Sequence, residues 1–300
     1  MQTLAPICLF TYKRLDCTIQ TLEALQKNHL AQESRLYVFS DGPKKSEDQA
    51  EIDKVRAATA SLKGFAEVKH VHRTENLGLA RSIISGVSEV IRQHGKVIVM
   101  EDDLLTTPNF LAFMNAALDF YQDNAKVFSI GGYTIPIQIP STFPFDAYPC
   151  PRHNPWGWAS WRNRWETVDW EVKGYDAFKE DAAARARFNR GGSDLSKMLD
   201  KQMSEKLDSW AIRWGFQQFL NNQITILPSV SKVRNIGFGP DATHTKFYDR
   251  YRSELDAGEK TTFKFVPVTE VPDFVLHTYR DKYSLRKRFI GRLKHYLGLP

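Results

Sequence analysis

Four short apolar runs in the first third of the chain have the pattern of buried parallel strands. They read APICLFTY, RLYVFSDG, AEVKHVHRT and KVIVMEDD. Most of them place apolar residues at consecutive positions rather than at every second one, which is typical of strands that are covered on both faces. The pattern therefore predicts four strands of one sheet.

Between these runs, apolar residues recur at the spacing of helices. Residues 18–27 and 79–91 carry such patterns, and the second pattern stops before Gly95. A third helix is predicted after Thr107-Pro108, where threonine would be the N-cap and proline the first helical residue, and its apolar positions continue over 110–121. Strands and helices alternate, which predicts a Rossmann-like α/β fold with a mostly parallel sheet and helices on both faces.

The second half of the chain is less regular. Residues 136–155 contain many prolines and little periodicity, so we expect a loop there. The tryptophan-rich segment WGWASWRNRW follows. Residues 176–207 have a polar helical pattern that is broken at Gly191-Gly192, and LDSWAIRWGFQQFL then predicts one more helix.

Polar clusters follow each of the four predicted strands. Since parallel strands bring ligands to the edge where their carboxyl ends meet, we expect these clusters to share one rim of the sheet. The members are Thr11 and Arg14 after the first strand, Asp41 after the second, Asn76 and Arg81 near the third, and Glu101, Asp102 and Asp103 after the fourth.

The three adjacent acids suggest a cation site. Carboxylate oxygens are hard ligands that suit Mg²⁺ or Mn²⁺. Neighbouring side chains of a strand point to opposite faces, so the three acids cannot share one role. The alternative is that acids at a strand end are solvated or cap the next helix.

The acidic segment VIVMEDDLLTTPNFLAFM resembles the metal motif of GT-A nucleotide-sugar glycosyltransferases, in the variant seen in N-acetylglucosaminyltransferase I. Further segments resemble that family in the same order along the chain. They are FTYKR, VFSDG, WGWASW, DSW and VSKVRNIGFGPDATHT. The loop before the predicted helix at 79–91 departs from that enzyme, and its Asn-Leu-Gly-x-Ala-Arg form resembles bacterial sugar transferases of the same class.

The resemblance implies a role for each matching residue. Arg14 and Asp41 would meet the nucleotide, Glu101 the donor sugar and Asp102 the ribose. We place Thr11, Asn76 and Arg81 in the same nucleotide-sugar site, because they lie on the predicted rim. Asp103 and His244 would hold Mn²⁺ or Mg²⁺, Asp208 would be the catalytic base, and the acceptor contacts would come from Trp156, Trp158 and Trp210.

Each assignment has a structural alternative. Asp41 is also typical of a turn before Gly42, and Arg81 of a helix surface. Asp208 is also a candidate N-cap, because a helix is predicted to follow it. His244 can be a loop residue without a ligand, and several of the seven tryptophans must belong to the core.

These implications predict an inverting, metal-dependent glycosyltransferase that uses a nucleotide-diphosphate sugar, UDP-linked by preference, and a glycan acceptor of a bacterial surface polysaccharide. We expect residues 1–135 to form the nucleotide-sugar-binding half and 136–250 the acceptor-binding and catalytic half of the same domain. A nucleotidyltransferase that makes sugar nucleotides is one alternative, although FTYKRLDC lacks the glycine-rich turn that holds a triphosphate. A non-catalytic nucleotide- or sugar-binding module is another.

Residues 251–300 are expected to form an extension that ends in a basic amphipathic helix. The net charge is +6, and from Arg280 onward there are seven basic residues and one acid, which leaves the rest of the chain neutral. That distribution argues against nucleic-acid binding by the body. It predicts either a contact of the tail with an anionic membrane surface or a helix packed on the body.

No stretch has the roughly 18 consecutive apolar residues of a membrane span. The N-terminal segment does not resemble a signal peptide, and three cysteines without metal-like spacing suit a reducing compartment. We therefore expect a cytoplasmic protein, at the inner face of the cell membrane if the tail binds lipid.

Overall fold

A computed structural model describes residues 3–238, 252–268, 270–284 and 287. Within these residues the chain forms an 8-stranded sheet in the order β3-β2-β1-β4-β8-β6-β9-β7. The four strands predicted from the sequence are present and pair in parallel. They are β1 (Ile7–Thr11), β2 (Arg35–Ser40), β3 (Glu67–His72) and β4 (Lys96–Glu101).

The second half of the chain extends the same sheet with strands that the sequence pattern did not reveal. Strand β8 (Trp158–Trp161) runs antiparallel to both β4 and β6 (Val127–Gly131). Strand β9 (Ile224–Pro228) is parallel to β6, and β7 (Ala147–Cys150) closes the edge in the antiparallel direction. Residues 136–155 are therefore not entirely loop. The predicted fold class, an α/β fold with a mostly parallel sheet between helices, is confirmed.

Consecutive residues of β1 face two different cores. Ile7 and Leu9 belong to the core on one face of the sheet, and Cys8 and Phe10 to the core on the other. The first core is covered by α1 (Leu15–Gln26), α4 (Phe110–Tyr121) and α10 (Asp273–Lys282), and the second by α3 (Leu79–His94), α5 (Arg162–Trp165) and α9 (Trp210–Leu220). Burial on both faces explains why this strand is apolar at every position.

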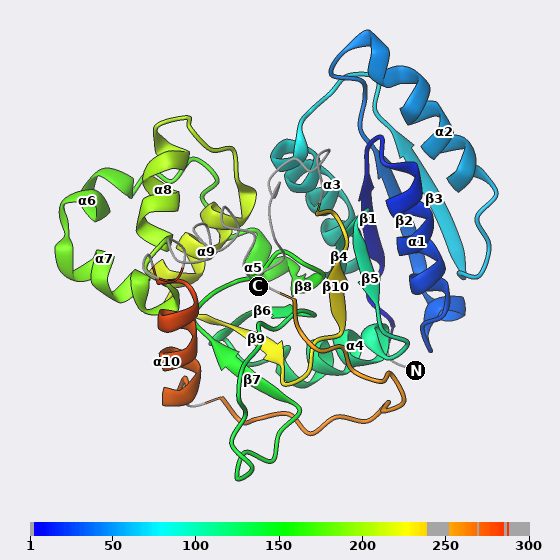
Figure 1. Ribbon diagram of the computed structural model, residues 1–300. Coiled ribbons are helices and arrows are strands. Elements are labelled where there is room, and N and C mark those ends of the chain that lie inside the picture. The colour runs from blue at the N-terminus through cyan, green and yellow to red at the C-terminus, as the bar shows by residue number, and fades with distance from the viewer. Residues whose placement is uncertain (1–2, 239–251, 269, 285–286, 288–300) are drawn as a thin grey trace, which may run out of the picture.

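Three helices form a lobe beside the sheet, seen at the left of Figure 1. They are α6 (Tyr175–Glu180), α7 (Ala182–Phe188) and α8 (Leu195–Met203), and they enclose their own apolar cluster with one face of α9. Helix α2 (Gln49–Ala60) lies at the opposite side of the molecule (Figure 1). The described residues also contain short 3-10 helices at Ala31–Glu33, Ser46–Asp48 and Asn189–Gly191.

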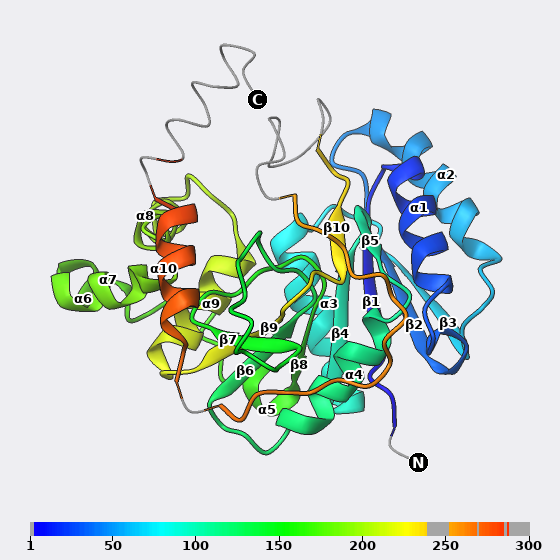
Figure 2. The ribbon, with the colours of Figure 1, turned by 60° about the horizontal axis from the view of Figure 1, so that its bottom comes forward.

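A two-stranded ribbon lies beyond the end of β4. It pairs β5 (Leu104–Thr106) with β10 (Val233–Asn235) in the antiparallel direction. Residues 252–268 then pass close to α4 on their way to α10, as both views show (Figures 1 and 2). The Lys232 ammonium, which is 3% exposed, pairs with Asp256 at 2.5 Å and anchors this passing segment.

The predicted cap of the third helix is wrong in detail. Helix α4 begins at Phe110 and its N-cap position is Asn109. Thr107 instead donates a hydrogen bond to Asn109 Oδ1 at 2.8 Å, while Asn109 Nδ2 donates to Asp256 at 2.8 Å. The helix therefore begins two residues later than the Thr-Pro motif predicts, and the Asn109 side chain is bound to Thr107 and Asp256 and does not cap it.

Within the part of the chain that is described, no helix is long and apolar enough to cross a membrane.

Candidate functional site

The three acids lie at the carboxyl end of β4, and Arg14 faces two of them. The Arg14 guanidinium donates to Asp102 Oδ1 and to Asp103 Oδ2, the latter at 2.9 Å. Asp102 is 3% exposed, and its Oδ2 also accepts the Tyr12 backbone N–H at 3.3 Å. Asp102 thus points back toward the turn after β1. Asp102 and Asp103 lie beyond the end of β4 and bind the same Arg14 nitrogen, so the predicted alternation of neighbouring side chains does not separate these two acids.

The segment after β10 packs against Asp103. The Ile236 backbone N–H donates to the Asp103 carbonyl at 2.8 Å, and Asn235 Nδ2 donates to Asp103 Oδ1 at 3.3 Å. A Cβ on Gly237 would lie 2.1 Å from Asp103 Oδ2. A side chain at this position would therefore have to displace the Asp103 carboxylate, and Asn235 and Gly237 join the site although the sequence analysis assigned no role to either.

Burial and mutual repulsion disturb the ionisation of the acids. Burial, together with the charges of Asp103 and Asp102, raises the pKa of Glu101 to about 8. Burial raises the pKa of Asp102 to about 6, although the Arg14 guanidinium opposes this. Burial alone would lower the pKa of Arg14, but the two carboxylates raise it above its ordinary value. One guanidinium is therefore too little positive charge for three carboxylates.

The donor set fits a hard divalent cation held by one carboxylate. Among the residues that the structure describes, no group of three or more His, Cys, Asp or Glu side chains converges on a metal position. Mg²⁺ and similar ions are often held by one or two carboxylates together with substrate phosphates. Asp103 is the candidate ligand, and Arg14 already binds its Oδ2, so a cation and Arg14 would compete there. His244 lies outside the described residues.

Asp41 organises the loop before α3. Its Oδ1 accepts the Leu77 backbone N–H and its Oδ2 the Gly78 backbone N–H, each at 3.0 Å. Asn76 ties the same loop to the end of β2 by donating to the Gly42 carbonyl at 2.8 Å. Asp41 and Asn76 thus lie together at the rim, and both already hold backbone groups of the two loops.

Arg56 of α2 is a further rim residue that sequence patterns did not indicate. Its guanidinium donates to three backbone carbonyls, at 2.8 Å to Arg73, 3.3 Å to Asp41 and 3.5 Å to Ser40. It therefore fixes the carboxyl ends of β2 and β3 side by side. No local pattern marks this role, because Arg56 and its partners are far apart in sequence.

Two of the residues predicted at the rim are less suited to ligand binding. Thr11 is 5% exposed, and its hydroxyl donates to the Phe39 carbonyl at 3.2 Å. Arg81 is exposed in the first turn of α3. Thr11 thus serves the pairing of β1 with β2. Arg81 lies on the surface of a helix, which was the structural alternative to a role in nucleotide-sugar binding.

A cavity of about 550 Å³ connects the acid cluster to the second half of the chain. Glu101 lines it from the sheet, and Asp208 lines it from the turn before α9. Leu79, His153, Trp156 and Trp210 contribute to the same wall. The fold therefore brings residues 107 positions apart in the sequence, Glu101 and Asp208, to one concave space.

Asp208 is not the N-cap of α9. Ser209 occupies that position, and its hydroxyl accepts the Ile212 backbone N–H at 3.3 Å. The Asp208 side chain is 67% exposed and pairs with Arg213 at 3.2 Å. Its carboxylate thus lines the cavity and is held to α9 by Arg213 alone among the side-chain contacts of the described residues.

The predicted acceptor tryptophans differ in their surroundings. Trp158 is 1% exposed and stacks on Trp165 and Trp210 at centroid distances of 5.7 and 5.0 Å. This burial leaves no face for a sugar, so Trp158 is a core residue and its predicted acceptor contact does not fit the structure. Trp156 is half-buried and lines the cavity, as does one edge of the largely buried Trp210.

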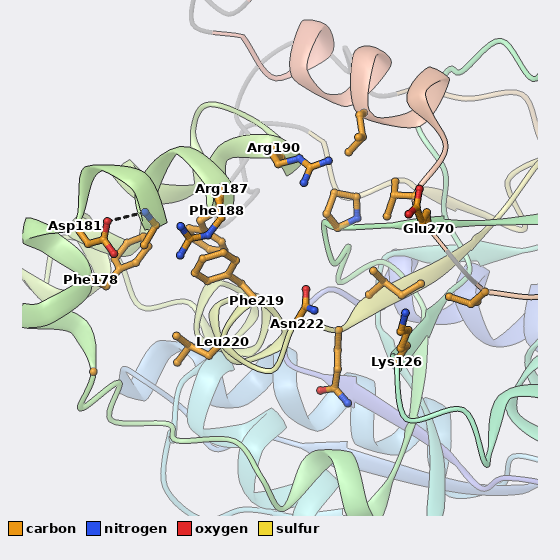
Figure 3. A pocket seen from close by; sticks show the side chains of 18 of the residues that line it. Lys126, Phe178, Asp181, Arg187, Phe188, Arg190, Phe219, Leu220, Asn222 and Glu270 are labelled. Carbon is orange, nitrogen blue, oxygen red and sulfur yellow. Dashed lines mark hydrogen bonds between the residues drawn. The ribbon is translucent and has the colours of Figure 1, made fainter.

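A second cavity of about 920 Å³ lies between the helical lobe and α10 (Figure 3). Arg187, Arg190 and Asn222 line it from the side of α7 and α9, and Lys126 and Glu270 lie across from them (Figure 3). Its lining reaches the amino-terminal ends of β6 and β9, so it lies at the sheet edge opposite the acids. Pro151 and Phe188 line both cavities and separate them.

Neither a family model nor a curated protein sequence matches this chain. Several solved structures are similar in outline. A mannosyltransferase, PcManGT from Pyrobaculum calidifontis in complex with GDP-Man and Mn²⁺, is 10% identical with a TM-score of 0.39, over 73% of this chain and 69% of that one. S. aureus TarS 1-349 is 12% identical with a TM-score of 0.40, over 76% and 59%.

A UDP-glucose pyrophosphorylase complexed with UDP-glucose is 10% identical with a TM-score of 0.37, over 77% of this chain and 92% of that one. The match spans 59% of TarS 1-349 and 37% of the longer TarS chain. Similarity at this level does not distinguish sugar transfer from nucleotidyl transfer, so it assigns no activity to the chain. The resemblance to N-acetylglucosaminyltransferase I remains a prediction from the sequence.

The acid cluster predicts that the cation-free protein loses stability as the pH rises from 6 to 8. The folded pKa of Glu101, about 8, lies above its ordinary value of 4.5, so the folded state retains a proton that the unfolded state releases. Stability therefore falls across this window, by up to about 1.4 kcal/mol per pH unit for one proton. Urea unfolding in EDTA at several pH values measures this slope.

Glu101→Gln removes the titrating group and should make the slope shallower. Asp48→Asn is the matched control, because hydrogen bonds from Lys13 and Tyr12 lower the pKa of Asp48 to about 2 and keep it ionised throughout the window. A slope that is the same in Glu101→Gln and in the unchanged protein would contradict this account of the cluster.

Proposed function

We propose that this chain is an inverting glycosyltransferase that moves a sugar from a nucleotide-diphosphate sugar, UDP-linked by preference, to a hydroxyl of a glycan acceptor. The observation that carries the proposal is the shared cavity. Glu101 of the acid cluster and Asp208 before α9 both line it. A donor held at the acids and an acceptor held near Asp208 would meet in this space.

The donor side is supported by the loops at the rim. Asp41 and Asn76 lie where β2 and β3 end, and Arg14 lies between them and the acids along the sheet edge. The nucleoside would bind near Asp41, and Arg14 would make charge-assisted hydrogen bonds to the diphosphate. A divalent cation at Asp103, when bound, would neutralise the charge that develops on the departing phosphate. Asp102 would orient the ribose and Glu101 the sugar.

The acceptor side is supported by the position of Asp208. An inverting transfer needs one base that removes the proton of the attacking hydroxyl. Asp208 would take this proton as the acceptor oxygen bonds to the anomeric carbon. The bond from that carbon to the phosphate oxygen breaks, and the nucleoside diphosphate leaves with the electron pair. The Arg213 guanidinium lies 3.2 Å from the Asp208 carboxylate and would hold its orientation.

The nucleotidyltransferase alternative needs a binding turn for a triphosphate after β1. In this chain the turn from Thr11 to Leu15 contains no glycine and has two bulky side chains, Tyr12 and Arg14, of which Arg14 is bound to the acids. No observation within the described residues favours that activity over sugar transfer. A non-catalytic binding module would give Asp208 no role at the cavity.

The acceptor, the compartment and the lipid contact remain proposals. A surface glycan carried on a lipid would be used at the cytoplasmic face of the membrane. Tyr283, which lines the cavity, is followed in the sequence by five basic residues. They are Arg286, Lys287, Arg288, Arg292 and Lys294. We propose that this basic tail binds anionic lipid near the part of the cavity that receives the acceptor.

Replacement of Asp208 tests the catalytic assignment. Asp208→Asn keeps the shape and removes the basic oxygen, so we expect sugar transfer to fall by about 10²-fold or more while UDP affinity stays the same. Transfer is measured by release of UDP from UDP-sugars with a mixture of bacterial glycan acceptors, and affinity by calorimetry with UDP.

Asp176→Asn, an exposed acid in α6, is the matched control and should leave both quantities unchanged. Transfer that is undiminished in Asp208→Asn would remove Asp208 from the mechanism. Loss of UDP binding in that variant would place it in the donor site instead.

Removal of residues 285–300 tests the lipid contact. The shortened chain should lose binding to vesicles of phosphatidylcholine with about one third phosphatidylglycerol, since each basic residue near an anionic surface contributes about 1 kcal/mol. Co-sedimentation measures the binding, and vesicles of phosphatidylcholine alone are the control. Equal sedimentation of the full and shortened chains would exclude the tail as the membrane contact.

A further inference from the structure

Two lysines in the wall of the cavity take no part in the proposed mechanism. Lys201 lies in the last turn of α8, and Lys206 lies in the turn between α8 and α9. Both side chains are exposed, and both residues line the cavity that Asp208 also lines. Within the residues that the structure describes, neither ammonium group has an ion pair.

The turn after α8 brings the two lysines together. The Lys206 backbone N–H donates to the Lys201 carbonyl at 2.9 Å, and the Glu205 N–H donates to the Gln202 carbonyl at 3.2 Å. These two bonds are those of a Schellman motif, and Glu205 has the positive φ, 58°, that the motif requires. The Glu205 side chain is exposed and does not line the cavity, so it does not neutralise the lysines there.

The same turn is tied to the candidate base. Gln202 Oε1 accepts the Ser209 backbone N–H at 2.7 Å, so the residue after Asp208 is bound to the helix that carries Lys201. Lys206 precedes Asp208 by two positions. An acceptor whose hydroxyl approaches Asp208 would therefore lie near both lysines.

The arginine and the other carboxylates of this cavity belong to ion pairs or to the acid cluster. Arg152 binds Asp194 through two guanidinium nitrogens, at 2.8 and 3.1 Å. Asp208 pairs with Arg213, and Glu101 ends β4 beside the other acids. The chain before the basic tail has equal numbers of basic and acidic residues, so the lysines are not part of a generally basic surface. They leave uncompensated positive charge on the acceptor side.

We propose that Lys201 and Lys206 bind an anionic group of the acceptor, beside the hydroxyl that Asp208 deprotonates. This inference rests on the proposed function and adds the chemical class of the acceptor to it. The group is a carboxylate of an acidic sugar or a phosphate that links sugar units, since both present anionic oxygens to ammonium donors. Lysine is a point charge on a flexible stem, so the pair selects charge rather than one exact shape.

NMR of the full chain with ¹³C-dimethylated lysines tests the proposal, because dimethylation keeps the positive charge. Lys201→Gln and Lys206→Gln identify the two signals. Lys197→Gln identifies the signal of an exposed lysine of α8 that does not line the cavity. Methyl glucuronide, methyl glucoside 6-phosphate and uncharged methyl glucoside are added in turn, with UDP and Mg²⁺ present. At least one anionic glycoside should shift the signals of Lys201 and Lys206, and methyl glucoside should not.

Substitutions measure the contribution of each charge. Lys201→Gln and Lys206→Gln should each weaken binding of the anionic glycoside about fivefold, as expected for one ion pair at an exposed site, and leave UDP affinity unchanged. Lys206→Arg keeps the charge and should recover most of the loss, and Lys197→Gln should have no effect. The glycoside that binds more tightly identifies the group as carboxylate or phosphate.

Several results would overturn the inference. Equal shifts with methyl glucoside would show that the wall does not recognise charge, and equal shifts of the Lys197 signal would show unspecific adsorption of anions. No shift with either anionic glycoside would remove the lysines from acceptor binding. If UDP alone shifts both signals, the lysines belong to the donor site.

Two further measurements separate this inference from its neighbours. If vesicles with phosphatidylglycerol shift the signals of Lys201 and Lys206 and the anionic glycosides do not, the lysines bind lipid phosphate and the inference is wrong. Calorimetry with UDP tests the donor site separately. A chain that binds UDP but neither anionic glycoside contradicts this inference alone, whereas a chain that binds no UDP contradicts the proposed function itself.

Discussion

The arrangement of the site depends on the electrostatic cost of three consecutive carboxylates at the end of a buried strand. Arg14 offsets part of that cost by binding Asp102 and Asp103 together. The raised pKa values of Glu101 and Asp102 indicate that the compensation is incomplete. Breaking a buried ion pair typically costs about 3–5 kcal/mol, so the turn after β1 and the end of β4 are fixed to each other by charge as well as by the sheet.

The neighbouring segments follow from this constraint. The chain after β10 comes so close to Asp103 that a side chain at position 237 would have to displace the Asp103 carboxylate, and the bond from the Ile236 N–H to the Asp103 carbonyl fixes that approach. Glu101 is the one acid that Arg14 does not bind directly, and it faces the cavity that also contains Asp208 and His153. A cation with phosphate ligands would supply the missing positive charge. The cation proposed for donor binding would thus also offset the repulsion among the three acids.

The sequence predicted the parts of the fold that local periodicity determines. Strands β1 to β4, the helix that ends at Gly95 and the rim with Asp41 and the acids all follow from short apolar patterns and strand direction. Prediction from the sequence failed where contacts between distant residues determine the structure. Thr107-Pro108 has the form of a helix start, yet α4 begins at Phe110 and the Asn109 side chain is bound to the distant Asp256. Strand β8 pairs antiparallel with β4, and β7 pairs antiparallel with β9, within tryptophan- and proline-rich segments. The hydrogen bonds of Ser129 with His153 and with Thr225 join residues 24 and 96 positions apart.

The most direct test of the central claim is calorimetry of UDP binding with Mn²⁺ and with EDTA, on the unchanged chain and on Asp103→Asn. If the acids hold a cation that completes the donor site, UDP binds the unchanged chain only with Mn²⁺ and fails to bind Asp103→Asn under either condition. Asp176→Asn, which replaces an exposed acid of α6, should behave as the unchanged chain does. UDP binding of equal affinity in EDTA, or its persistence in Asp103→Asn, would contradict a donor site built on these acids.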